Sequence, residues 1–75
     1  MLPDLPCFYD PDFTGNAGEF SLPSNEVHHA LKVLRLAIGN QIIVSNGKGI
    51  IGSCKVSSIN RNELFYKTEY LFDTS

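Results

Sequence analysis

The chain of 75 residues has no long apolar run, only two cysteines and no repeat or low-complexity segment. No run approaches the roughly 18 apolar residues of a membrane-spanning helix, and the N-terminus lacks the basic and long apolar regions of a signal peptide. Cys7 and Cys54 supply neither a disulfide framework nor the spacing of a metal site. We therefore expect a cytoplasmic protein with two reduced, half-buried thiols.

An excess of positive charge is also absent, because six Lys and Arg residues stand against eight Asp and Glu, a formal net charge of −2. A dedicated nucleic-acid-binding domain is usually basic, so composition alone counts against RNA as a ligand. The objection weakens where basic residues cluster, since local potential steers a polyanion more than whole-chain charge does. Alternatively, another domain supplies most of the attraction.

The length allows one small domain with a small core. An apolar fraction of 43% and a charged fraction of 19% are ordinary for a globular domain and argue against disorder. There is no room for a deep cofactor cleft. If the protein is an enzyme, most of its active site must lie elsewhere, and we expect residues 1–75 to be a single domain of a longer protein.

The segment from Leu22 to Gly39 is the only one whose apolar residues recur at helical spacing. Ser24 is the predicted N-cap, and Gly39 is the predicted stop that supplies a left-handed conformation. The helix should pack on the core through one apolar stripe, formed by Val27, Ala30, Leu31 and Leu34.

The remaining segments alternate with period 2, which predicts short strands at 7–9 and 19–22 and longer ones at 41–45, 50–59 and 63–72. Asn46-Gly47 indicates a tight turn, extended as NGKG, and Gly52 a bulge or bend. Asn60-Arg61-Asn62 indicates a second turn, before the last strand. Phe13 should anchor the turn-rich segment 10–18. In so short a chain these strands can cover a core only if the sheet curls. We predict a mainly β fold, a small, partly open β-barrel of about five strands with one helix. The last strand should place four residues on one face, Leu64, Tyr66, Tyr70 and Phe72.

The helix also carries the candidate binding residues. At 100° per residue, His28, Lys32 and Arg35 fall within about 60° of one another and roughly 110° from the apolar stripe. Such a ridge suits a phosphate backbone, to which His28 and His29 would add hydrogen bonds or stacking. A solvated helix face is the simpler interpretation, and His29 beside Val33 is more simply packed.

Other chemistry is poorly supported. Adjacent histidines point about 100° apart on a helix, and no third ligand has suitable spacing, so no metal site is expected. Neither cysteine has a partner base in the sequence, and Cys54 reads as a core residue. Lys48, at the tip of the NGKG turn, is expected to be solvated, with a phosphate contact as its one functional role.

Residues 28 to 49, HHALKVLRLAIGNQIIVSNGKG, resemble the N-terminal motif of the ribosomal RNA small subunit methyltransferase E family (RsmE). In that motif a His precedes three variable residues and Val-Leu-Arg, then a Gly-Asp/Asn turn, an apolar strand and an Asp/Asn-Gly hairpin. The matching positions here are His29, Val33-Leu34-Arg35, Gly39-Asn40, Gln41 to Ser45 and Asn46-Gly47. The opening Pro6-Cys7-Phe8-Tyr9 resembles the family's start, except that Cys7 stands where many members have Arg.

The resemblance implies a PUA-like barrel that helps bind 16S rRNA. In full-length members it precedes a knotted SPOUT domain, which binds S-adenosylmethionine and methylates the N3 position of a uridine in 16S rRNA, in enzymes that are generally homodimeric. None of that domain lies within these residues, so no catalytic or cofactor residue is carried over, and the isolated domain is expected to be inactive. The alternative is a structural or protein-interaction barrel in which Arg35 pairs with a carboxylate. An α/β domain encoded after Ser75 would favour the methyltransferase.

Overall fold

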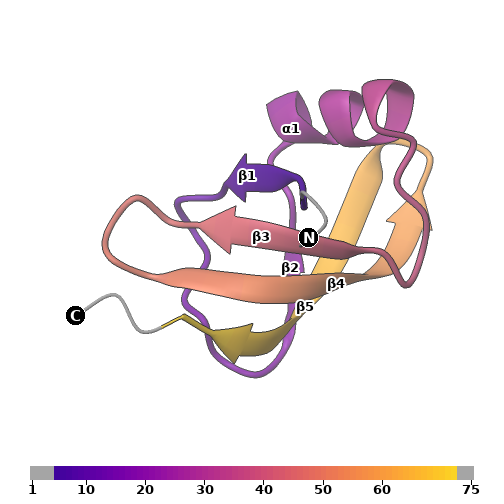
Figure 1. Cartoon of the computed structure of the whole chain (residues 1–75). Coiled ribbons are helices and arrows are strands. Elements are labelled where there is room, and N and C mark those ends of the chain that lie inside the picture. The colour runs from indigo at the N-terminus through magenta and orange to yellow at the C-terminus, as the bar shows by residue number, and fades with distance from the viewer. Residues whose placement is uncertain (1–4, 73–75) are drawn as a thin grey trace.

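The computed structural model describes residues 5–72, which form one five-stranded sheet and one helical segment (Figure 1). The strands lie in the order β1-β3-β4-β5-β2, with β1 parallel to β3 and every other pair antiparallel. Neither helical part within the described residues has the length and apolar character needed to cross a membrane. The elements are β1 (Cys7–Tyr9), β2 (Glu19–Ser21), α1 (Ser24–His28), the π-helix η1 (His29–Val33), β3 (Gln41–Ser45), β4 (Ile51–Asn60) and β5 (Glu63–Leu71).

The sheet curls because the register between β4 and β5 shifts twice, once after Ser53 and once after Val56. Such irregularities increase the local twist of a strand pair. The edge strands β1 and β2 do not pair with each other, so the barrel stays partly open, as predicted. The bulge predicted at Gly52 is displaced: Gly52 keeps its register with Val44 and Leu71, and the first irregularity follows Ser53.

The core is shared by the sheet, the helix and the turn-rich segment before β2. Alternate residues of the strands point inward, as the period of 2 requires, and Phe13 anchors its loop edge-on to Phe20 with ring centroids 5.3 Å apart. Cys54 belongs to this core, as predicted, whereas Cys7 is exposed and not half-buried. The buried apolar residues are Phe8, Phe13, Leu22, Val27, Ala30, Ile42, Val44, Cys54, Val56, Leu64 and Tyr66.

One buried polar pair joins the turn after β1 to β5. The Tyr66 hydroxyl on β5 donates a hydrogen bond of 2.6 Å to Oδ2 of Asp10, which follows β1. Asp10 is only 1% exposed, and its other oxygen accepts the amide of Asp12. Burial is the main cause that raises the pKa of Tyr66 far above its ordinary value, with the hydrogen bond to the Asp10 carboxylate second. The hydroxyl therefore stays a donor across the physiological range.

Asn46 shapes the β3–β4 loop. Its side-chain oxygen accepts the amides of Lys48 and Ile50, at 2.7 and 3.1 Å, and its side-chain nitrogen donates to the carbonyl of Phe13. The predicted turn is therefore held by a 95% buried asparagine that also ties it to the N-terminal loop. Gly47 has a φ of 73°, and a Cβ there would approach Cε1 of Tyr9 to 2.7 Å.

The helical segment is shorter and wider than predicted. It begins at Ser24 with Pro23 as N-cap, and no side chain caps it, so the prediction that Ser24 is the N-cap is wrong. From His29 the helix has π geometry, in which the amide of Leu34 bonds to the carbonyl of His29. The chain leaves the helix after Val33, well before Gly39, whose left-handed φ of 96° serves a turn into β3.

The wider turn changes which residues face the core. Val27 and Ala30 are buried and Leu31 is half-buried, as predicted, but Leu34 is 39% exposed. A stripe at spacing 3.6 cannot continue through a π turn, because each residue there turns through a smaller angle. Leu36, whose amide bonds to the carbonyl of Ala30, packs on the core instead.

The helix also covers the outer edge of β1. Figure 1 shows α1 lying across the end of the barrel next to β1. The amide of Tyr9 donates to Oε2 of Glu26 over 3.4 Å. Glu26 is thus occupied by the sheet, so its charge faces β1 and not the free side of the helix.

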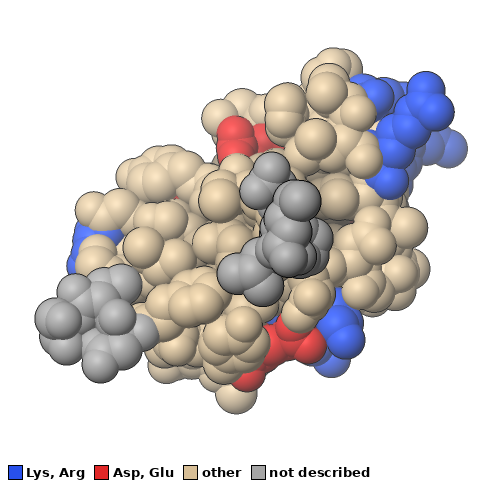
Figure 2. Space-filling model, viewed as in Figure 1, with Lys and Arg blue, Asp and Glu red and all other residues tan. Residues whose placement is uncertain are grey.

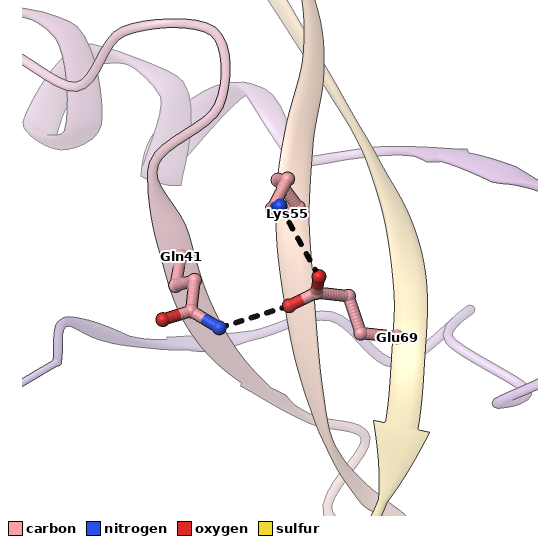
Figure 3. A network of polar contacts seen from close by, with 3 residues as sticks. All are labelled: Gln41, Lys55 and Glu69. Atoms are coloured by element: carbon pink, nitrogen blue, oxygen red, sulfur yellow. Dashed lines mark hydrogen bonds and ion pairs between the residues drawn. The ribbon is translucent and has the colours of Figure 1, made fainter.

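The outer face of the sheet neutralises part of the chain's positive charge. Figure 3 shows the side chain of Glu69 reaching from β5 across β4, where it meets both Lys55 of β4 and Gln41 of β3. Gln41 donates a 3.0 Å hydrogen bond to Glu69, and Nζ of Lys55 lies 3.4 Å from its other oxygen. The bond from Gln41, and then the charge of Lys55, lower the pKa of Glu69. At the end of β5, Tyr70 and Phe72 are 56% and 41% exposed, so they do not share the core position of Leu64 and Tyr66.

Replacing Tyr66 by Phe should lower the free energy of unfolding by about 1.5–3 kcal/mol, because it leaves Oδ2 of the buried Asp10 carboxylate without a donor. The matched control is Tyr70→Phe, which changes an exposed hydroxyl and should shift stability by less than about 0.5 kcal/mol. Urea denaturation measures both. Equal effects of the two substitutions would show that the Tyr66–Asp10 bond does not stabilise the fold.

Candidate nucleic-acid interface

A cleft of about 230 Å³ separates the helix from the β4–β5 turn. The helix wall comes from successive turns of α1 and η1, and the opposite wall from the two residues that connect β4 to β5. The residues that line it are Ser24, Val27, His28, Leu31, Lys32, Arg61 and Asn62.

The cleft has an apolar floor and a basic rim. Val27 is buried and Leu31 half-buried, since both also pack on the core. His28 and Lys32 lie four residues apart along the helix, and Arg61 contributes from the opposite wall. All three of these polar side chains are exposed. The structure therefore brings together two of the predicted residues, His28 and Lys32, with an arginine that was not predicted, Arg61.

The electrostatic character of the cleft is one-sided. No acidic residue lines it within the described part of the chain. Figure 2 shows blue side chains gathered at the corner where the end of the helix lies above the β4–β5 turn. The ion pair among the described residues joins Lys55 and Glu69, away from the cleft. Lys32 and Arg61 form no ion pair there, so their charges can act on a ligand. Cations gathered in this way favour an anionic ligand locally even in a chain whose net charge is −2.

Arg35 does not line the cleft, because the chain has left the helix before it. It is exposed, and it has a left-handed backbone with φ of 53°, the one such value among the described non-glycine residues. L-residues pay roughly 1–2 kcal/mol for this conformation. The predicted ridge is thus divided: His28 and Lys32 face the cleft, and Arg35 projects from the strained reversal after η1.

The other predicted residues lie apart. His29 is exposed beside an exposed Val33, so the expectation that it packs is wrong. Lys48 is exposed, as predicted, in the loop before β4, whereas Arg61 follows β4. Nine strand steps of roughly 3.3 Å, about 30 Å, separate the two ends of that strand. Lys48 therefore belongs to a different surface. Within residues 5–72, no three His, Cys, Asp or Glu residues gather as a metal site.

Arg61 and Asn62 were assigned only to a turn by the sequence. The signal for the turn was correct, since residues 61 and 62 connect β4 and β5. No local pattern shows that this turn lies against the helix, because that contact depends on the length of β4 and on how far the barrel curls. Their position beside the helix becomes visible only in three dimensions.

The thiols offer no alternative chemistry. Cys54 is fully buried, and burial is the main cause that raises its pKa from 9.0 to about 11. A thiol in this state is a poor nucleophile. Cys7 is exposed and its sulfur lies 3.8 Å from the carbonyl oxygen of Leu5, with no base beside it in the described structure.

One family model matches most of the chain. Residues 22–69, which include every residue of the cleft, match a family model described as an RNA methyltransferase PUA domain. No curated protein sequence matches the chain.

Three solved structures share the fold. A ribosomal RNA small subunit methyltransferase E from Neisseria gonorrhoeae, bound to S-adenosyl methionine, has a TM-score of 0.82 and 25% identity, over 95% of this chain and 30% of that one. A probable rRNA-methyltransferase from Porphyromonas gingivalis has a TM-score of 0.79 and 25% sequence identity, over 95% of this chain and 29% of that one. A putative methyltransferase from Legionella pneumophila with bound SAM has a TM-score of 0.86, over 95% of this chain and 29% of that one. Its sequence identity is only 17%, so it shows the fold alone. The chain spans less than a third of each of these proteins.

The left-handed residue after the helix gives a stability test. Arg35→Gly should be more stable than Arg35→Ala by about 1 kcal/mol, because glycine has no Cβ to strain this backbone. The control is Leu34, one residue earlier, with φ of −88°. There the order should reverse, with Ala more stable than Gly. Thermal unfolding compares the four variants, and the same order at both positions would contradict the left-handed conformation of Arg35.

The buried thiol gives a pH test. The thiol of Cys54 ionises near pH 9 in the unfolded chain but stays protonated to about pH 11 in the folded one. Its contribution to the free energy of unfolding is therefore complete below pH 9 and is lost as the pH rises towards 11. Stability should fall by up to about 1.4 kcal/mol per pH unit in this window from this group. Cys54→Ala should remove that part of the slope, and Cys7→Ala, at the exposed thiol, should not. Unchanged slopes in both variants would show that Cys54 ionises in the folded protein.

Proposed function

This chain belongs to the RNA methyltransferase PUA domain family, and we propose that it is the rRNA-recognition domain of a SAM-dependent 16S rRNA uridine-N3 methyltransferase. The match of residues 22–69 carries the proposal, because it extends from the start of the helix into β5. The resemblance to the RsmE family read from the sequence is thereby confirmed at the level of the family. The fold of the Neisseria gonorrhoeae and Porphyromonas gingivalis enzymes supports it.

The domain would position RNA, and the chemistry would take place elsewhere. Both SAM-bound relatives are more than three times as long as this chain, which leaves room for a methyltransferase domain to hold the cofactor. In our proposal that is a SPOUT domain, in a cytoplasmic protein that acts as a homodimer on the small ribosomal subunit. Residues 1–75 alone would be inactive. The net charge of −2 fits a domain that orients rRNA more than it attracts it.

The helix and the turns would supply the RNA contacts. Lys32 and Arg35 would contact phosphates, and His28 and His29 would donate hydrogen bonds or stack on exposed bases. Lys48 would make a separate contact at the other end of β4. These side chains are all exposed, and Lys32 and Arg35 pair with no carboxylate in the described structure.

A protein-interaction barrel is the second candidate, and one observation favours it. Val33 and Ile38, near the end of the helical segment, are 62% and 65% exposed. Large apolar side chains that stay exposed often mark contacts with another domain or subunit. The buried ion pair of Arg35 expected for this function is not found within residues 5–72, where the ion pair joins Lys55 and Glu69.

Removing the cations tests the choice. In the full-length protein, Lys32→Ala and Arg35→Ala should each weaken rRNA binding several-fold and lower the slope of log affinity against log salt by about 0.7–0.9. Filter binding at several salt concentrations measures both quantities. Lys67→Ala, an exposed cation on the sheet, is the matched control and should change neither.

Unchanged affinity and unchanged salt slope in both variants would exclude these residues as phosphate contacts. If the same variants instead dissociated the protein from itself or from a neighbouring domain, the interaction barrel would replace the RNA-binding proposal.

A further inference from the structure

We propose that the cleft between the helix and the β4–β5 turn holds one unpaired nucleotide of the RNA, with Lys32 and Arg61 at its phosphate and Asn62 at its base. The proposal rests on the RNA-binding function and adds to it the form of the ligand. Neither the family match nor the related structures assign a role to Arg61 or Asn62.

The shape of the cleft selects an unstacked base. It is concave, with about 230 Å³ between two walls and an apolar floor from Val27 and Leu31. An RNA duplex presents phosphates and a shallow groove, whereas a base splayed from a loop can enter a cleft and place its flat face on apolar side chains. No aromatic residue lines the cleft within the described chain, so the base would pack on aliphatic groups and not stack on a ring.

The charges suit the phosphate of the same nucleotide. Lys32 reaches the rim from η1 and Arg61 from the opposite wall, and no carboxylate of the described residues lines the cleft to compete. An arginine presents a planar fork of donors to two phosphate oxygens, and a lysine adds a point charge. Cations on both sides of one cleft favour a ligand that enters it over one that lies across the surface.

Two further polar side chains have no partner of their own. Asn62 and Ser24 line the cleft, and neither makes a side-chain hydrogen bond in the described structure. An asparagine side chain offers a donor and an acceptor, which matches the edge of a base. Ser24 occupies the start of the helix without capping it. The missing cap leaves its hydroxyl available to the ligand.

The experiment compares two RNAs and three variants. The probes are a stem-loop with an unpaired loop and a fully paired duplex with the same stem. The parent protein should bind the stem-loop at least about tenfold more tightly than the duplex. Arg61→Ala should weaken stem-loop binding about tenfold and lower the salt slope by about 0.7, one phosphate contact. Arg61→Lys should restore the salt slope but only part of the affinity.

Asn62→Ala should act differently, because it removes a base contact. It should weaken stem-loop binding about 3- to 10-fold, leave the salt slope unchanged and leave duplex binding unchanged. Lys67→Ala is the control for a lost charge. Arg61 and Asn62 are exposed turn residues, so unchanged unfolding midpoints are expected and are measured for every variant.

The outcomes separate the two proposals. Tight binding of both RNAs, with Asn62→Ala and Arg61→Ala without effect, would overturn the nucleotide cleft while RNA recognition through other residues stands. Absence of binding to either RNA by the parent protein would overturn RNA recognition itself. Loss of stem-loop preference in Asn62→Ala, with duplex binding intact, would establish the cleft.

Discussion

The hydrogen bond from Tyr66 to Asp10 is the constraint on which the rest of the fold depends. It joins the turn after β1 to the middle of β5, 56 residues later in the chain, inside a core with few other polar groups. A buried carboxylate is costly unless donors satisfy it, and here a phenol and a backbone amide do so. The helix packs on this framework through its contacts with β5, and the cleft lies between the helix and the turn that begins β5.

The helical segment both packs on the core and presents basic side chains to solvent, and its π turn makes the two compatible. A regular helix would have placed Leu34 on the core and Arg35 beside Lys32 on one ridge. The π turn ends the helical segment early, packs a half-buried Leu36 on the core in place of Leu34, and turns Arg35 away from the cleft. π turns occur frequently at functional sites, where they re-aim side chains. Here the segment keeps its packing at Val27 and Ala30 while it presents cations in two directions.

Local patterns predicted most of the fold and part of the site. Strand periodicity located all five strands to within a residue or two, because alternate burial at Ile42 and Val44 or Leu64 and Tyr66 is a local property. The π turn was missed because one extra residue per turn leaves no distinct sequence pattern. Tyr70 was misplaced because the register shift beside it inserts one extra residue of β5, Glu69, between Thr68 and Tyr70 and so reverses the face on which Tyr70 lies. Arg61 was missed because its partner surface lies some thirty residues away, beyond the reach of any spacing rule.

The bond between the Tyr9 amide and Glu26 has a consequence for how the protein avoids self-assembly. An edge strand with unpaired amides is a template for adding another strand from a neighbouring molecule. β1 is only three residues long, lies between Pro6 and Pro11, and has an outer amide already taken by a helix carboxylate. The helical segment that carries the candidate RNA-binding side chains therefore also occupies an amide of β1 with which another strand could pair.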